Sequence, residues 1–215
     1  MLGLYVTVPI ACFRKGTARE YLETELIPPP STCYGFLLSF VGETDRTTHD
    51  GVRVTCGLIG YPSKSVVLRT MWRVKSKPLG SAGNTRPDYQ QLLTNLRLVI
   101  WMDSHQEKNQ SSTLESRVSD MLDPQRRIAV DRFGGLSLGE STHLVDEILP
   151  ISVMQDRGTD EEAQLFVVNE KGRLTLPVWV DHVGSTKSRY TTGDLSMRSA
   201  WTPPSVDETP MISSR

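Results

Sequence analysis

Apolar side chains alternate with other residues at the start of the chain, at positions 2, 4, 6 and 8. A period of two is typical of a β-strand, so the pattern predicts a strand that ends at Pro9. The polar and charged stretch 13–27 predicts a loop, and three prolines then lead into a helix. Ser31 is a suitable N-cap residue for this helix, and Gly42 is a suitable residue to end it. The helix has one apolar face, made of Tyr34, Leu37, Leu38 and Val41.

The next apolar stretches predict three strands and a long hairpin. Residues 52–61 and 63–75 both have strand patterns and are separated by a turn that contains proline. A polar segment with glycines follows at 75–84, and the apolar run 96–102 returns as a third strand. We therefore expect a β-hairpin over about 63–102 that projects from the sheet and ends in a polar tip.

The second half begins with a helix and a glycine-rich segment. Ser112 or Thr113 is suited to cap a helix that runs to about Leu122 and stops before Pro124. Residues 133–141 contain three glycines and have no apolar period. They predict a loop whose backbone can approach a ligand closely, because glycine carries no Cβ.

The last third of the sequence predicts further strands and a tail. A strand is expected near 147–153, and a second hairpin joins 164–168 to 174–180. From 184 to 215 serine, threonine and proline dominate without periodicity. That composition predicts a tail at the surface that is extended or partly disordered.

The order of the predicted elements indicates the fold class. Strand, helix, two strands, helix and strand is the β-α-β-β-α-β order of ferredoxin-like folds. We therefore predict an α+β fold with a ferredoxin-like core, a projecting β-hairpin and a C-terminal β extension. Residues 1–183 would form this domain, followed by the tail 184–215. Many unrelated functions share such a core, so the fold alone does not identify one.

Composition narrows the class of protein without pointing to a function. The 215 residues are 38% hydrophobic and 23% charged, which is typical of a globular domain. The net charge of −1 gives no general attraction to nucleic acid, so such a site would need local clustering. The three cysteines form no C-x-x-C pair, so neither zinc nor a disulfide framework is expected. No apolar run approaches the roughly 18–20 residues of a membrane span, and no secretory signal is expected.

Basic residues gather in the predicted hairpin. Between Pro62 and Arg97 the local charge is +6, because Asp88 is the only acid in that stretch of sequence. Trp72 and Tyr89 lie in the same stretch and could stack on nucleic-acid bases. The alternative is a solvated hairpin whose cations pair with acids elsewhere in the fold. The cations are Lys64, Arg69, Arg73, Lys75, Lys77, Arg86 and Arg97.

The glycine-rich segment has three interpretations. It contains the pattern G-x-S-x-G around Ser137, which in α/β-hydrolases places a nucleophilic serine on a strand-to-helix turn, with His182 as the later base. The charged residues before Ser137 make a poor buried strand, which argues against this hydrolase. A loop whose N–H groups approach phosphates is the second interpretation, favoured by the neighbouring Arg126, Arg127 and Arg132. A plain structural turn is the third.

The opening loop and the histidines are less specific. Arg14, Lys15 and Arg19 could contact an anion, but the glutamates that follow them also allow a loop closed by salt bridges. The four histidines lie in different predicted elements, and no H-x-x-x-H occurs. We therefore expect no metal site and no cofactor.

Three pieces of this sequence resemble the CRISPR-associated Cas-five family of type I Cascade complexes. The family has A-S-F-R after its first strand, and the chain has A-C-F-R at Ala11–Arg14, with Cys12 in place of the usual serine. The family has P-P-P-S-T-x-x-G before its first helix, which Pro28–Gly35 matches. Its glycine loop L-G-x-S-E is similar to Gly135–Ser141. The resemblance covers about residues 1–150.

The resemblance implies a RAMP-type domain in which the hairpin is the family's thumb. It implies a scaffold without catalytic activity that caps the 5′ handle of crRNA and contacts the Cascade backbone and large subunits. Contact with target DNA near the PAM would be indirect, and the setting would be the cytoplasm of a prokaryote. A type I-B-like member is expected, in antiviral defence or in RNA-guided transposition. A repeat-processing endoribonuclease of the same family and the serine hydrolase remain as alternatives.

The predicted RNA contacts come from the opening loop, the first helix, the hairpin and the glycine-rich segment. Ser31 would also cap and position the first helix. No catalytic residue and no metal ligand is predicted. The predicted contacts are Arg14, Lys15, Arg19, Ser31, Tyr34, Trp72, Arg73, Lys75, Lys77, Arg86, Arg126, Arg127, Arg132, Gly134, Gly135, Ser137 and Gly139.

Overall fold

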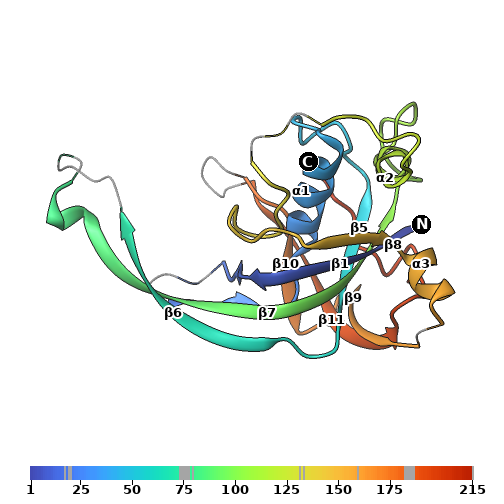
Figure 1. The fold of residues 1–215 in the computed structure, drawn as a ribbon. Coiled ribbons are helices and arrows are strands. Elements are labelled where there is room, and N and C mark those ends of the chain that lie inside the picture. Colours follow the sequence, from blue (N-terminus) through green and yellow to red (C-terminus); the bar gives the residue numbers. More distant parts are fainter. Residues whose placement is uncertain are drawn as a thin grey trace.

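One large β-sheet forms the centre of the computed structural model, and helices pack on both of its faces (Figure 1). The fold is a mixed α/β fold dominated by strands, which confirms the coarse class predicted from the sequence. The structure describes residues 1–16, 18, 21–72, 78, 80–130, 132, 134–158, 160–181 and 187–214.

The elements have the following bounds. The strands are β1 (Leu2–Ala11), β2 (Phe13–Arg14), β3 (Tyr21–Leu22), β4 (Thr24–Glu25), β5 (Arg53–Ile59), β6 (Ser63–Trp72), β7 (Thr85–Asp103), β8 (Glu147–Pro150), β9 (Glu162–Val168), β10 (Leu174–Trp179) and β11 (Arg189–Ser199). The helices are α1 (Pro30–Val41), α2 (Leu114–Leu122) and α3 (Ile151–Asp156), with a 3₁₀ turn at Ala82–Asn84.

The main sheet runs in the order β10-β11-β9-β5-β7-β1-β8. β1 pairs antiparallel with β7 on one side and with β8 on the other. β3 and β6 both pair with the outer part of β7, and β2 pairs with β4 in a small second sheet. In the part β8-β1-β7-β5, α1 connects β1 to β5 and α2 connects β7 to β8.

Two apolar clusters cover the two faces of the sheet. Alternate residues of β7 divide between them, because successive side chains of a strand point to opposite faces. Leu98 and Ile100 join the larger cluster with α1 and α2. Val99 and Trp101 join the smaller cluster with Ile151 of α3. The larger core therefore lies under α1, the helix that positions the site described below.

α1 begins differently from the prediction and ends as predicted. Pro29 is the N-cap residue and Pro30 is the first helical residue, so the prediction of Ser31 as the cap is wrong. Proline suits this first position, since its fixed φ matches the helix and its missing N–H would have no helical partner. Gly42 ends the helix with a φ of +71°, which confirms the predicted end. At α2 the hydroxyl of Thr113 accepts a hydrogen bond from the N–H of Ser116, 3.2 Å away.

β1 continues through Pro9, where the sequence predicted its end. β8 pairs with β1 only as far as Thr7, whose carbonyl accepts from the N–H of Asp146. Pro9 lies two residues further along β1, so its backbone nitrogen points to the same side as the backbone of Thr7. β8 no longer runs beside β1 at that position. The missing N–H of proline therefore costs no ladder hydrogen bond at this open edge.

The β6–β7 hairpin extends well beyond the rest of the fold (Figure 1). It pairs from Ser63 with Thr94 to Trp72 with Thr85. β7 begins at Thr85, earlier than the predicted 96–102, because pairing with β6 satisfies its backbone without an apolar period. Residues 75–77 and 79 of the predicted tip lie outside the described residues, as do residues 73 and 74 at the end of the predicted strand.

The strand predicted near 147–153 is present in its first half and is replaced by a helix in its second half. β8 ends at Pro150, and Ile151–Asp156 form the short helix α3. Ile151 and Met154 are three residues apart and are both buried in the smaller cluster. A helical turn brings them to one face, which an extended chain would not do.

The C-terminal part of the sheet differs most from the sequence prediction. β9 and β10 do not pair with each other, because β11 lies between them. Gly193 of β11 pairs with Val168 of β9 on one side and with Leu174 of β10 on the other. The predicted hairpin is therefore wrong, and so is the surface tail for Arg189–Ser199. The chain beyond β11 returns to the core, where Ile212 is fully buried.

Candidate functional site

The glycine-rich segment packs against the end of β1. A Cβ at Gly139 would lie 3.1 Å from the carbonyl oxygen of Cys12, and the φ of +102° also favours glycine there. His143 joins the two segments, since its Nδ1 accepts hydrogen bonds from the N–H groups of Cys12 (3.3 Å) and Glu140 (3.2 Å). Burial lowers the pKa of His143, which favours the neutral ring that can accept both bonds. The A-C-F-R motif and the glycine-rich segment are therefore neighbours in the fold.

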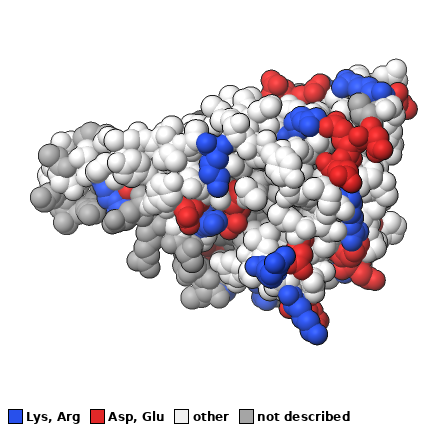
Figure 2. All heavy atoms as spheres, turned by 90° about the horizontal axis from the view of Figure 1, so that it is seen from below, with Lys and Arg blue, Asp and Glu red and all other residues white. Residues whose placement is uncertain are grey.

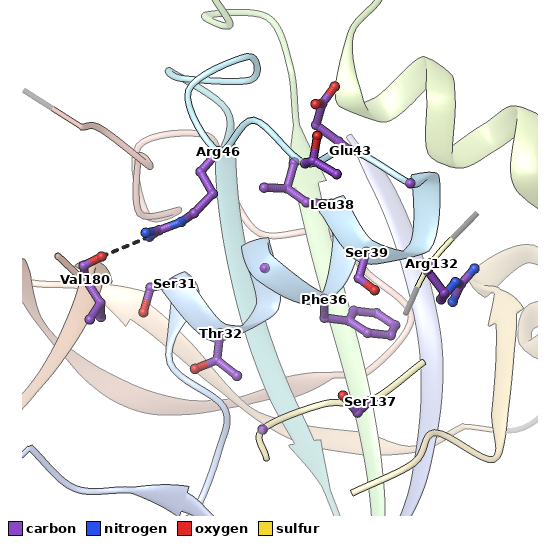
Figure 3. A pocket seen from close by; sticks show the side chains of 14 residues that line it. Ser31, Thr32, Phe36, Leu38, Ser39, Glu43, Arg46, Arg132, Ser137 and Val180 are labelled. Atoms are coloured by element: carbon purple, nitrogen blue, oxygen red, sulfur yellow. Dashed lines mark hydrogen bonds between the residues drawn. The ribbon is translucent and has the colours of Figure 1, made fainter. Parts of the chain in front are cut away.

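A groove of about 580 Å³ lies between α1, the loop after it and the glycine-rich segment (Figure 3). Ser31 and Thr32 line it from the first turn of α1, and Ser137 lines it from the opposite side. Gly35 and Gly139 also line it, and a Cβ at Gly35 would occupy open space, so the absence of a side chain there leaves room for a ligand. The other lining residues are Phe36, Leu38, Ser39, Gly42, Glu43, Thr44, Arg46, Arg132 and Val180.

Two arginines give the groove its charge. Arg46 and Arg132 lie on opposite sides of it (Figure 3). The Arg46 guanidinium lies 4.3 Å from the centre of the Trp179 ring and donates a 3.0 Å hydrogen bond to the carbonyl of Val180. Within the described chain, neither arginine forms an ion pair. Both charges are therefore available to an anion in the groove.

Among the described lining residues, the one acid is already paired. Glu43 accepts a 2.7 Å hydrogen bond from Arg117 of α2. Burial opposes ionisation of Glu43, but hydrogen bonds from Arg117 and from the following loop lower its pKa overall. Glu43 thus stays ionised beside a neutralising cation, and the groove keeps the positive charge of its two arginines.

The structure brings four of the predicted RNA contacts together in this groove: Ser31, Arg132, Ser137 and Gly139. Gly134 and Gly135 are exposed in the same segment but do not line the groove. Arg126 and Arg127 are exposed as well, and Arg126 pairs with Asp120 at 2.8 Å. The Arg127 guanidinium donates to the carbonyl of Met121.

Tyr34 is not placed to contact RNA. Its side chain is 1% exposed and packs near Trp179, and its hydroxyl donates a 2.7 Å hydrogen bond to the carbonyl of Arg46. Burial raises its pKa. The prediction is wrong here because Tyr34 lies on the apolar face of α1, which the sheet covers. Its role is to support the loop that carries Arg46.

The opening loop is partly closed by internal contacts. Arg14 is exposed and donates a 2.7 Å hydrogen bond to the carbonyl of Ala18. Lys15 forms a loose pair with Glu23 at 3.9 Å, as the salt-bridged alternative expected. Arg19 lies outside the described residues.

The cations of the β6–β7 hairpin are largely neutralised in the part that the structure describes. Arg69 pairs with Glu140, Arg86 with Asp88, and Arg97 with Glu161, at 3.0, 2.6 and 2.7 Å. From below, the described surface of the hairpin carries few charges (Figure 2). The local charge of +6 counted in the sequence therefore overstates the free charge. Arg73, Lys75, Lys77 and the side chain of Trp72 lie outside the described residues.

Ser137 does not lie in the nucleophile elbow that the hydrolase interpretation expects. A nucleophile elbow places the serine between a strand and a helix. Ser137 instead forms an isolated β-bridge with Leu144, and a turn and β8 follow it. His182, the base that this interpretation needs, lies outside the described residues. The described residues also contain no group of three or more His, Cys, Asp or Glu side chains that could hold a metal ion.

Arg46 and Trp179 were not among the contacts predicted from the sequence, although Arg46 lines the groove and packs on Trp179. Arg46 lies in a polar loop after α1, and Trp179 ends a strand more than 130 residues later. The two meet because α1 packs beside β10. No local signal marks either residue as part of a site.

Comparison with known proteins identifies the family. No family model matches the chain. A protein of Myxococcus xanthus (strain DK1622) described as "CRISPR-associated protein Cas5" is 48% identical over 198 residues, which are 91% of this chain and 90% of that protein. The chain belongs to the Cas5 family of CRISPR-associated proteins, as its sequence motifs predicted.

One solved structure has a similar fold. A chain from a structure titled "CRISPR RNA-guided surveillance complex" has a TM-score of 0.57 at 12% identity, over 92% of this chain and 89% of that one. A second, titled "Crystal structure of Cas protein", has a TM-score of 0.48 at 13% identity, over 93% and 94% of the two chains. At such identities the first match supports the fold alone. Among the described residues, no helix is long and apolar enough to span a membrane.

Proposed function

We propose that this Cas5 protein is a Cascade subunit of a type I-B-like system that binds and caps the 5′ handle of crRNA. The observation that carries the proposal is the groove, where Arg46 and Arg132, which form no ion pair with the described residues, lie on opposite sides of a lining that includes Ser137 and Gly139 of the glycine-rich segment. Membership of the Cas5 family supports an RNA-guided complex as the setting. Its partners would be the Cascade backbone subunit and large subunit, in the cytoplasm of a prokaryote.

The groove suits a sugar–phosphate backbone better than a base. Arg46 and Arg132 can donate charge-assisted hydrogen bonds to phosphate oxygens. The hydroxyls of Ser31, Thr32 and Ser137 can donate or accept with phosphate and ribose groups. Gly35 lets the RNA backbone approach α1 closely, because a Cβ there would occupy open space. The arginines and hydroxyls would therefore hold the RNA backbone by their charge and their positions, without breaking a bond in it.

Other parts of the fold would extend the contact. We infer a ferredoxin-like core from the strand order β8-β1-β7-β5 with its two connecting helices, and the β6–β7 hairpin would be the thumb. Arg73, Lys75 and Lys77 would supply cations near the tip of that thumb. Arg14, Lys15 and Arg19 would extend the contact from the opening loop. The complex would serve antiviral defence or RNA-guided transposition.

Binding measured against salt concentration tests the groove. We expect Arg46→Ala with Arg132→Ala to weaken crRNA binding and to reduce the slope of log K against log salt by about two, since each lost phosphate contact removes about one. Lys171→Ala is the control, because Lys171 is exposed in the turn between β9 and β10. An unchanged slope in the double variant would exclude the groove as the phosphate site.

We also propose that the protein has no catalytic activity of its own. The alternative is a repeat-processing endoribonuclease, which would cleave repeat RNA without metal. Incubation of the purified protein with repeat RNA in EDTA distinguishes them. We expect intact RNA, and specific cleavage within the repeat would overturn the scaffold proposal.

A further inference from the structure

Glu140 connects the glycine-rich segment to the β6–β7 hairpin. Its Oε2 accepts a 3.0 Å hydrogen bond from Arg69 of β6, and its Oε1 accepts a 2.8 Å hydrogen bond from Gln90 of β7. Arg69 also donates to the amide oxygen of Gln90. The two carboxylate oxygens are therefore each held by a different strand of the hairpin.

Glu140 is also tied to the end of β1, through its backbone and His143. The N–H of Glu140 donates to Nδ1 of His143 (3.2 Å), which also accepts from the N–H of Cys12 (3.3 Å). The carbonyl of Glu140 accepts from the N–H of His143 at 2.9 Å. One residue thus joins the hairpin, the glycine-rich segment and the end of β1.

The two faces of the hairpin show which side this contact occupies. Leu68 and Tyr89 are cross-strand partners on one face and are 62% and 53% exposed. Gln90 points to the other face and is 1% exposed. A buried amide needs hydrogen-bond partners, and Gln90 has them in Arg69 and Glu140. The contact therefore lies midway along the hairpin, on the face opposite to Leu68 and Tyr89, and it buries Gln90.

We propose that Glu140 is a positioning residue that couples the orientation of the hairpin to the shape of the anion groove. Ser137 and Gly139, which line the groove, lie three residues and one residue before it in the chain. A displacement of the hairpin would pull on Glu140 and move these two residues. This inference rests on the proposed function, because it concerns the groove that would hold the RNA backbone.

Hydrogen exchange of the free protein tests the junction without RNA. Glu140→Gln keeps the shape and removes the charge that Arg69 contacts. We expect the N–H groups of Leu138 and Val145, which are hydrogen-bonded within the segment, to exchange about tenfold faster. Glu161→Gln is the matched control, since its pair with Arg97 has similar exposure at 2.7 Å but does not touch the segment. Equal exchange in the two variants would overturn the proposal.

A double-mutant cycle gives a second measurement on the same pair. Arg69→Met removes the donor from β6 and leaves Glu140 in place. If the two residues act through one contact, the combined variant should raise exchange no more than the larger single effect. Additive effects of Arg69→Met and Glu140→Gln would also overturn the proposal.

RNA binding separates this inference from the proposed function. We expect Glu140→Gln to weaken crRNA binding about fivefold while leaving the salt slope unchanged, because Glu140 contacts no phosphate. Loss of affinity with a reduced slope would contradict a positioning role. If the wild-type protein bound no crRNA, the proposed function would fail, and the exchange experiment would still decide whether Glu140 holds the hairpin and the glycine-rich segment together.

Discussion

His143 shows how much of this site depends on the protonation of one buried side chain. Its Nδ1 accepts hydrogen bonds from two backbone N–H groups, that of Cys12 directly after β1 and that of Glu140 in the glycine-rich segment. A protonated ring would present a donor to those two donors, and both bonds would be lost. Glu140 and Arg69 are the charged groups that face the ring, and they act on its pKa in opposite directions.

The lowered pKa of His143 predicts a loss of stability in acid. The unfolded chain takes up a proton near the ordinary pKa of 6.5, whereas the folded ring resists it. The contribution is complete above that pH, so the free energy of unfolding should fall as the pH drops below 6.5. His143→Gln should remove this part of the pH dependence. Urea unfolding of both proteins at pH 7.5 and pH 5.5 measures it, and identical pH dependence would contradict the assignment.

At the scale of elements, α1 is held at its two ends by backbone geometry. Pro29 and Pro30 set its start, and Gly42 ends it with a left-handed residue whose N–H bonds back to Ser39. These ends fix where Ser31 and Arg46 lie relative to the groove. A change at either end should therefore alter stability before it alters the chemistry of the groove.

Gly35 within α1 and Gly42 directly after it predict opposite effects on stability. Gly42→Ala places a Cβ at a φ of +71° and 2.8 Å from Val130, and should cost about 1 kcal/mol or more. Gly35→Ala meets nothing within 4 Å on an exposed helical position, and should stabilise by about 0.5–1 kcal/mol. Thermal unfolding of both variants checks the signs. Equal effects would show that the helix end is not set by Gly42.

At the scale of the whole molecule, the C-terminal chain completes the sheet. β11 is the shared partner of β9 and β10, and the segment after it returns to pair Met211 with Arg53. Arg198 of β11 donates two hydrogen bonds to the carboxylate of Glu208 in this segment. The contact with Arg198 lowers the pKa of Glu208 to about 2.

Truncation tests this dependence. A chain that ends at Val180 should lose cooperative unfolding, because β9 and β10 would each lose a partner and the core would lose Ile212. A chain that ends at Ile212 is the control and should unfold cooperatively, since it keeps β11. Circular dichroism and calorimetry measure both. Cooperative unfolding of the shorter chain near the wild-type temperature would contradict a structural role for β11.

Local patterns in the sequence were sufficient for the elements that depend on neighbouring residues. The alternation at positions 2–8 predicted β1, and Gly42 and Thr113 predicted helix ends, because capping and periodicity act over a few residues. The motifs at Ala11–Arg14 and Pro28–Gly35 were also sufficient for the family. These motifs did not indicate which lysine and arginine side chains would lack an acidic partner in the folded protein.

The tertiary structure alone decided which distant groups meet. It inserted β11 between β9 and β10, although the sequence of the two strands suggested a hairpin. It paired Arg69 with Glu140 and Arg97 with Glu161, and so removed cations that a count along the sequence treats as free. It also brought Arg46 beside Trp179 at the groove. Such contacts depend on how strands and helices pack in space, and no local period or spacing in the chain specifies that packing.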